Sequence, residues 1–149
     1  MIRAVLDANV FVSGILTEGF PRRILRAWRA GQFDLVTARA VLDEIARVLR
    51  YPKIVRRHRW SETEIREFME NLAALAIVTP GKLRLSVVAA DPTDDRYLEC
   101  AVEAEADCIV TGDRHLLDLG AYGEVEIISP REFAGLLSYP GGTSIGSPT

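Results

Sequence analysis

The feature that most constrains this chain is the alternation of short apolar runs with amphipathic helical segments along most of its length. Short apolar runs bounded by polar or turn-forming residues are typical of buried strands. Strands that alternate with helices pair in parallel, and the helices cover both faces of the sheet. The sequence therefore predicts an α/β fold, a three-layer α/β/α sandwich with a parallel sheet of four or five strands. The expected strands cover residues 2–6, 33–36, 77–79, 107–110 and 125–128.

Capping residues predict where the helices begin. Asn9 and Thr37 are expected to cap the first and third helices through their side chains. Residues 61–64 form a serine-x-x-glutamate capping box, and residues 91–94 place a proline in the first turn of a later helix. The expected helices cover residues 10–16, 22–30, 38–50, 62–76, 92–106, 114–119 and 130–137.

The length of 149 residues suits one domain with its own hydrophobic core. We expect that domain over residues 1–137, followed by a tail over residues 138–149 whose glycine, serine and proline content is typical of a linker. No apolar run approaches the roughly 20 residues that span a bilayer. Asp7 interrupts the apolar N-terminal run, and no small-residue cleavage site follows it. We therefore expect a cytoplasmic protein with no membrane partner.

Charge is unevenly distributed along the chain. The net charge is −3, which argues against a general nucleic-acid coat protein. Eleven basic and three acidic residues lie between Arg22 and Arg59, so this segment carries +8 and the rest of the chain −11. Cys100 and Cys108 form neither a CxxC motif nor a cysteine–histidine cluster, so we expect two buried free thiols.

Four acidic residues fall where an open α/β sheet binds its ligands, at the carboxyl ends of the strands. Asp7 ends the first expected strand, and Asp113 follows the fourth. Asp95 lies in the first turn of a helix, and Glu44 lies on the helix after the second strand. Because parallel connections return to the same edge of a sheet, these four side chains are expected to converge.

Each acid also has a purely structural interpretation. Asp7 fits a turn at the end of a strand, Asp113 a helix cap, and Glu44 a solvated helix position. Asp94 fits the capping partner of Asp91. Glu44 is the hardest to interpret in this way, because its neighbours are the apolar residues of its helix: Val41, Leu42, Ile45 and Val48.

Convergence would give the acids a chemical role. Packed carboxylates repel one another and raise their pKa values unless a cation neutralises them. Oxygen ligands at an open site suit Mg²⁺ or Mn²⁺, which can polarise a phosphodiester and activate a water molecule. The pattern thus predicts a metal-dependent reaction on a phosphodiester, with the basic segment holding the substrate.

Four motifs carry a family resemblance: VLDANVFVSGIL, the glutamate of VLDEIARVL, DPTDDRYLECA and IVTGDRHLL. In their order and spacing they resemble the PIN-domain ribonucleases and, among these, the toxins of prokaryotic toxin–antitoxin pairs related to VapC. The resemblance covers residues 1–137. It implies metal-dependent endonucleolytic cleavage of RNA, commonly by a homodimer, and for toxin members restraint by a small antitoxin protein.

The resemblance also implies roles for individual residues. Asn9 would support the first acid, and Thr111 would line the site. Asp95 matches the family acid before the apolar helix, whereas Asp91 and Asp94 match capping residues. His115 is interpreted as a surface helix residue and not as a general base. The metal ligands, which would hold Mg²⁺ or Mn²⁺ and are the catalytic acids, would be Asp7, Glu44, Asp95 and Asp113.

Three other functions are compatible with part of this pattern. A phosphoryl-transfer enzyme or receiver domain also places acids at a sheet edge but needs a lysine nearby, and neither Lys53 nor Lys82 follows such an acid. A catalytically silent PIN module would bind RNA or protein without cleavage, and such members usually lack acids that are all present here. A housekeeping RNA-processing nuclease cannot be separated from a toxin by sequence.

The basic residues from Arg47 to Arg59 allow three interpretations. They form a solvated helix end and loop in which Trp60 is a packing anchor, or a surface that docks an acidic antitoxin segment. Alternatively they track RNA phosphates while the tryptophan stacks on a base. The residues predicted to bind RNA are Arg56, Arg57, Arg59 and Trp60.

Overall fold

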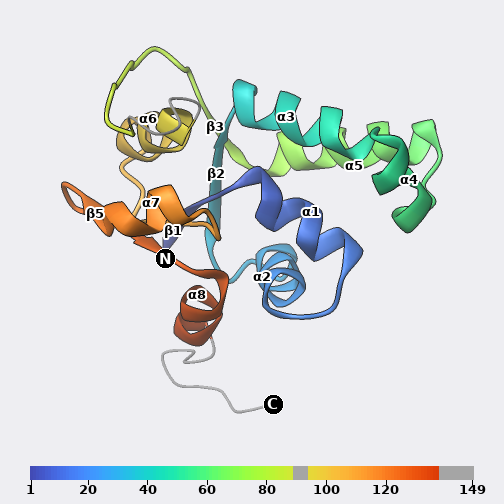
Figure 1. Cartoon of the computed structure of the whole chain (residues 1–149), viewed down its shortest axis with the longest axis horizontal. Helices are drawn as coiled ribbons and strands as arrows, with labels where there is room; N and C mark the ends of the chain where they lie inside the picture. The colour runs from blue at the N-terminus through green and yellow to red at the C-terminus, as the bar shows by residue number, and fades with distance from the viewer. Residues whose placement is uncertain (89–93, 138–149) are drawn as a thin grey trace.

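One mixed sheet forms the centre of the fold in the computed structural model, which describes residues 1–88 and 94–137 (Figure 1). Within these residues the strand order is β3-β2-β1-β4-β6-β5, and only β5 is antiparallel to its neighbour. The predicted α/β fold is confirmed. The strands are β1 (Arg3–Leu6), β2 (Asp34–Ala38), β3 (Ile77–Thr79), β4 (Cys108–Val110), β5 (Ala121–Tyr122) and β6 (Val125–Ile128).

Helices cover the sheet on both sides. The helix α6 packs across β1, β2 and β4, whereas α2 packs between α1 and α8, and Figure 1 shows α6 and α8 on opposite sides of the strands. None of the described helices is long and apolar enough to cross a membrane. The helices are α1 (Ala8–Leu16), α2 (Phe20–Arg29), α3 (Arg39–Leu49), α4 (Pro52–His58), α5 (Glu62–Leu75), α6 (Asp95–Glu103), α7 (Arg114–Leu119) and α8 (Pro130–Leu137).

The sheet contains one strand that the sequence does not predict. The described part of the chain has six strands, and the extra one, β5, is only two residues long. It forms a hairpin with β6 through a turn in which Gly123 has φ 59°, a left-handed conformation that glycine adopts readily. A two-residue strand carries no detectable alternation, so only the turn could have indicated it.

Two predicted helix caps are wrong. Asp7, not Asn9, caps α1, because the Asp7 side chain accepts a hydrogen bond from the Asn9 backbone N–H. Thr37 is buried inside β2, and the N-cap residue of α3 is Ala38, which provides no side-chain hydrogen bond. The capping box between Ser61 and Glu64 is confirmed, with both of its hydrogen bonds formed.

A short helix replaces an expected loop in the basic segment. The helix α4 (Pro52–His58) begins with a proline, which is favourable in the first turn because its missing N–H needs no partner there. Its residues mix basic and apolar types without a clear buried stripe, and none of them is fully buried. The sequence pattern therefore gives no helical signal beyond the proline.

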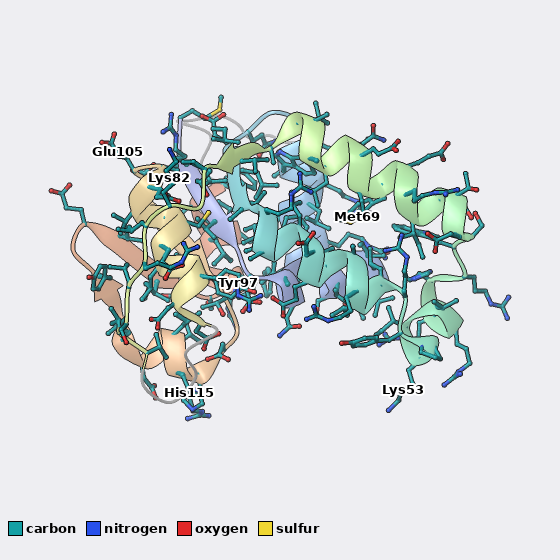
Figure 2. The ribbon with its side chains drawn as sticks, turned by 90° about the horizontal axis from the view of Figure 1, so that it is seen from above. Lys53, Met69, Lys82, Tyr97, Glu105 and His115 are labelled. Atoms are coloured by element: carbon teal, nitrogen blue, oxygen red, sulfur yellow. The ribbon has the colours of Figure 1, made fainter. Side chains whose placement is uncertain are left out.

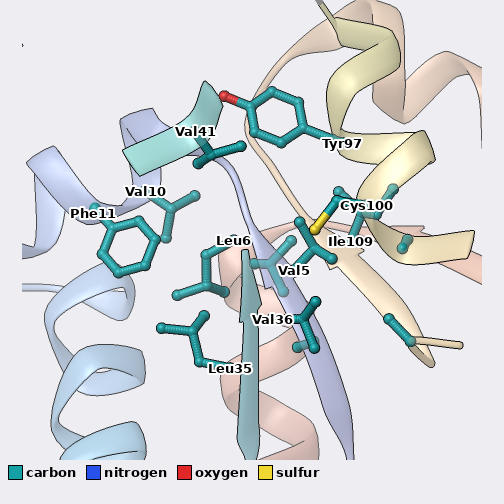
Figure 3. Close-up of a cluster of buried hydrophobic side chains, with 14 of the residues drawn as sticks. Val5, Leu6, Val10, Phe11, Leu35, Val36, Val41, Tyr97, Cys100 and Ile109 are labelled. Carbon is teal, nitrogen blue, oxygen red and sulfur yellow. The ribbon is translucent and has the colours of Figure 1, made fainter. Parts of the chain in front are cut away.

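The topology creates a switch point beside β1. From β1 the chain adds β2 and β3 on one side, and then returns to place β4 on the other side of β1. Ligands of open α/β sheets bind at such a reversal, beyond the carboxyl ends of the strands. The interior behind it is filled by apolar side chains that include Val5, Leu6, Val36 and Ile109 (Figure 3).

The helix that leaves the switch point is anchored by its neighbour. Arg22 of α2 donates hydrogen bonds to the carbonyl oxygens of Gly14 and Ile15 at the end of α1, at 3.0 and 2.8 Å. A Cβ at Gly14 would lie 2.5 Å from Leu25 Cδ1, so glycine lets the two helices approach closely. These contacts position α1 and, with it, the turn at Asp7.

The described cysteines behave as predicted. Cys100 and Cys108 are free and buried, and burial raises the pKa of each thiol to about 12. Both therefore stay protonated, which leaves them outside any nucleophilic chemistry near neutral pH.

Candidate metal centre

Asp7 is fixed at the end of β1 by three hydrogen bonds. Its backbone N–H donates to the Val110 carbonyl at 3.0 Å, which ties it to the end of β4. Its Oδ1 accepts from the Asn9 backbone N–H at 2.9 Å, and its Oδ2 accepts from the Thr111 hydroxyl at 2.7 Å. The side chain is buried, with only 4% of the residue exposed. Asn9 itself is exposed, and the support it gives comes from its backbone.

Thr111 joins Asp7 to Asp113. The buried Thr111 hydroxyl donates to Asp7 and accepts from the Asp113 backbone N–H at 2.9 Å. Asp113 in turn caps α7, because its Oδ1 accepts from the backbone N–H groups of His115 and Leu116 at 2.8 and 3.2 Å. The predicted acids at the ends of β1 and β4 are thus linked through a single threonine side chain.

Glu44 reaches the same edge through Tyr97. The Tyr97 hydroxyl donates to Glu44 Oε1 at 3.1 Å and accepts from the Ala8 backbone N–H at 3.2 Å. Arg96 Nη1 also donates to Glu44 Oε1, at 3.0 Å, in a partly buried ion pair. Figure 2 shows Tyr97 where α6 and α3 approach each other. A buried tyrosine therefore connects Glu44 with the residue that follows Asp7.

The protonation of Tyr97 follows from its surroundings. Burial raises the pKa of its phenol well above the ordinary value, and the nearby carboxylates of Asp7 and Glu44 raise it further. Figure 3 shows the ring within the buried cluster, with the hydroxyl pointing away from Cys100. The hydroxyl stays protonated and serves as a fixed donor to Glu44.

A second group of ligand atoms lies around Asp113. One oxygen of Asp94, one oxygen of Asp113 and one ring nitrogen of His115 all lie within 4.8 Å of one another. Asp94 is buried, whereas the side chain of His115 is 53% exposed. Among the described residues this is the one group of three or more acidic, histidine or cysteine side chains close enough to share a metal ion.

Among the described residues, the predicted acids Asp7, Glu44 and Asp95 all lie outside this group, and Asp95 has partners of its own. Its Oδ1 accepts from the backbone N–H groups of Val87 and Val88, at 3.0 and 2.9 Å. The carboxylate thus binds the segment that leads away from β3. Asp91 lies outside the described residues, so its predicted capping pair with Asp94 stays a prediction.

The arginines of the basic segment are on the surface, whereas its tryptophan is not. Arg56, Arg57 and Arg59 are exposed, and Arg59 has a left-handed φ of 62°. The half-buried Trp60 ring packs against His58 and Phe68, with ring centroids 5.1 and 5.3 Å apart. These contacts favour the packing-anchor interpretation of this residue over base stacking.

Residues 3–115 match the family model of the PIN domain. The chain belongs to the PIN-domain family. PIN domains have a nuclease fold, and members of the family are generally metal-dependent ribonucleases. A comparison with curated proteins finds no match to this chain. The PIN-domain match spans every acid of the site and ends at His115.

The side chains present fit a divalent cation. Asp7, Asp94 and Asp113 offer carboxylate oxygens, the preferred ligands of Mg²⁺ and Mn²⁺. Asp7 and Asp94 are buried and Asp113 is partly buried, and a cation would relieve the repulsion between the neighbouring carboxylates of Asp94 and Asp113. PIN nucleases typically use divalent metals, so the chemistry of the donor set agrees with that of the family.

Three residues of this region have no functional role in the sequence prediction: Asp94, Tyr97 and His115. Asp94 is placed among the capping residues, because capping and metal binding use the same residue types at a helix start. In the sequence, Tyr97 cannot be distinguished from the other core residues of α6. His115 is indeed an exposed helix residue, and only its position two residues after Asp113 could have indicated that its ring faces the acid.

Proposed function

We propose that this PIN domain is an Mg²⁺- or Mn²⁺-dependent endoribonuclease that hydrolyses phosphodiester bonds in RNA. The observation that carries the proposal is the hydrogen-bonded link from Asp7 through Thr111 to Asp113 at the switch point of the sheet. It ties the Asp7 carboxylate to the backbone of Asp113, an acid from a distant segment, and Asp94 is within ligand distance of Asp113.

Asp7, Asp94 and Asp113 would hold the metal, with Glu44 as the fourth acid. Asp94 replaces Asp95 in this assignment, because an Asp94 oxygen lies within ligand distance of Asp113, whereas Asp95 lies outside that group. When bound, the metal supplies a water molecule of lowered pKa and neutralises charge on the scissile phosphate.

The protein's own groups orient the site. Thr111 and the Asn9 backbone N–H each hold one oxygen of Asp7, which limits its rotation. Tyr97 and Arg96 both bind Oε1 of Glu44, which leaves its other oxygen free of these two contacts. Groups that orient ligands in this way raise metal affinity by reducing the freedom lost on binding.

Cleavage of a labelled single-stranded RNA by the purified protein tests the proposal. Cleavage is expected with Mg²⁺ or Mn²⁺ and not with chelator, and Ca²⁺ should not replace them because its looser coordination positions water poorly. A circular RNA should also be cut, because an endonuclease needs no end. Equal cleavage in excess chelator would disprove the metal mechanism, and binding without cleavage would instead indicate a silent module.

The exposed arginines of α4 and its C-terminal turn are proposed to bind RNA phosphates. Each such contact releases counterions, so binding to a single strand should weaken with salt with a logarithmic slope of about −0.7 per contact. Replacing Arg56, Arg57 and Arg59 together should flatten the slope by about two units if all three bind phosphate. The slope is measured by fluorescence anisotropy of a labelled RNA on an Asp7→Asn background. An unchanged slope in the triple variant would show that these arginines do not bind RNA phosphates.

The toxin role, the antitoxin partner and the homodimer are further proposals that rest on the resemblance of the four motifs to VapC-related toxins. Induced expression of a toxin should arrest growth, and Asp7→Asn should abolish the arrest. Normal growth with an active enzyme would favour a housekeeping RNA-processing nuclease. Sedimentation equilibrium tests the homodimer, and a single monomeric species would contradict it.

A further inference from the structure

His115 both supports Asp113 and faces it. Its backbone N–H donates to Asp113 Oδ1 at 2.8 Å, and its ring Nδ1 lies 3.8 Å from the same oxygen. One of its ring nitrogens also lies within 4.8 Å of an Asp94 oxygen. The imidazole is therefore close to both acids that flank it in the candidate metal centre, although it extends from the exposed side of α7.

A nitrogen ligand would change the metal preference of such a site. Mg²⁺ binds oxygen almost exclusively, whereas an imidazole suits first-row transition metals, whose affinity for nitrogen ligands exceeds that of Mg²⁺. We propose that His115 is a ligand of the metal and makes the centre selective for Mn²⁺ over Mg²⁺. This inference rests on the proposed function, since it concerns the same metal centre.

The chain contains an internal control for this proposal. It has two histidines, and the second, His58, is held by protein contacts at both ring nitrogens. Its Nδ1 accepts from the Trp60 backbone N–H at 2.8 Å, so its Nε2 carries the proton and donates to the Leu49 carbonyl at 2.9 Å. If a histidine nitrogen binds the metal, one substitution at each of the two positions therefore shows which histidine it belongs to.

Pulsed electron paramagnetic resonance of the Mn²⁺-loaded protein tests the proposal without an activity measurement. A ¹⁴N coupling that changes to ¹⁵N when histidine alone is labelled is expected in the wild type. The coupling should persist in His58→Gln and disappear in His115→Ala. Titration calorimetry should show that His115→Ala weakens Mn²⁺ binding by about tenfold or more while Mg²⁺ binding changes little.

The outcomes separate this inference from the proposed function. Mn²⁺ binding without a histidine coupling, and with the same preference over Mg²⁺ in His115→Ala, would overturn the role of His115 and leave the metal centre intact. A wild type that binds neither metal would overturn the metal-dependent function itself. If His115→Ala does not fold, the labelled wild type and His58→Gln together still decide, because only two histidines are present.

Discussion

Two groups of carboxylates meet at the start of α6, and they differ in whether another carboxylate lies close by. Asp94 lies within ligand distance of Asp113, which is linked to Asp7 through Thr111. Asp95, its neighbour in sequence, begins a row of acids along α6 that bind backbone N–H groups. The comparison teaches that residue type does not distinguish the two groups: Asp94 has another carboxylate within ligand distance, whereas Asp95 accepts from two backbone N–H groups.

The structural row, which we call the α6 row, consists of Asp95, Glu99 and Glu103. These residues are four positions apart, so they lie on one face of the helix. Glu99 accepts from the Leu85 N–H at 2.8 Å. Glu103 accepts from three successive N–H groups, those of Gly81, Lys82 and Leu83, at 3.1, 2.8 and 3.0 Å. The α6 row thus binds segment 81–88 to α6. Its carboxylates accept hydrogen bonds from backbone N–H groups that would pair with a neighbouring strand if the segment were part of a sheet.

The largest expected effect concerns the first group, Asp7, Asp94 and Asp113, which we call the strand-end group. Asp7→Asn should lower the cleavage rate by about 100-fold or more, because a correctly held metal contributes several kcal/mol and 1.36 kcal/mol is tenfold in rate. The fold should survive, since asparagine can still accept the Asn9 N–H and cap α1. Glu99→Gln in the α6 row is the matched control and should retain activity. Equal losses in both variants would erase the distinction between the groups.

A smaller effect is expected at Tyr97, which binds Glu44 but belongs to neither group. Tyr97→Phe should weaken Mn²⁺ binding by about 10- to 100-fold, the usual effect of losing a group that orients a metal ligand. The ring remains in the core, so the variant should fold. Titration calorimetry measures the affinity, and an unchanged value would limit Tyr97 to packing.

The α6 row is expected to affect stability in a pH-dependent way. Desolvation alone would raise the pKa of Glu103, but hydrogen bonds from the N–H groups of Leu83, Lys82 and Gly81 outweigh it and lower the pKa below its usual value of 4.5. The lowered pKa means that the ionised form stabilises the fold, fully above the usual pKa and less as pH falls through the folded-state value.

Glu103→Gln should therefore have a lower Tm than the wild type near neutral pH, and the difference should narrow below about pH 4. Thermal unfolding over a pH series measures both curves. A difference that stays constant to low pH would show that the substitution acts through packing and not through the charge of the carboxylate.

The smallest effect is expected from charge removal in the strand-end group without metal. Asp94→Asn should raise the Tm by a few degrees in chelator, since it relieves repulsion with Asp113. Mg²⁺ or Mn²⁺ should stabilise the wild type more than this variant, by mass action. A lower Tm for the variant in chelator would instead assign Asp94 to the structural acids.

Much of the fold follows from the sequence, because short apolar strands alternate with amphipathic helices. The exceptions are elements too short or too irregular to show a period, such as β5 and α4. The cap at Asp7 could not be chosen over Asn9, because both residue types accept backbone hydrogen bonds at a helix start.

The sequence predicts a site at the strand ends and favours Asp95 over Asp94 as a ligand, whereas the contacts of the two side chains lead us to propose the opposite choice. Adjacent helical residues point about 100° apart, so a shift of one residue at the start of α6 decides which carboxylate faces Asp113 and which faces segment 81–88. That phase depends on the contacts of α6 with the sheet and with this segment, which are long-range and have no local pattern.

Mn²⁺ titration of Asp94→Asn and Asp95→Asn, each with a thermal melt, tests the distinction most directly. The structure predicts that Asp94→Asn weakens Mn²⁺ binding by about tenfold or more without a loss of Tm in chelator. It predicts that Asp95→Asn binds Mn²⁺ like the wild type and melts at a lower temperature, because its contacts with Val87 and Val88 weaken. Loss of Mn²⁺ binding in Asp95→Asn, with normal binding in Asp94→Asn, would contradict the account.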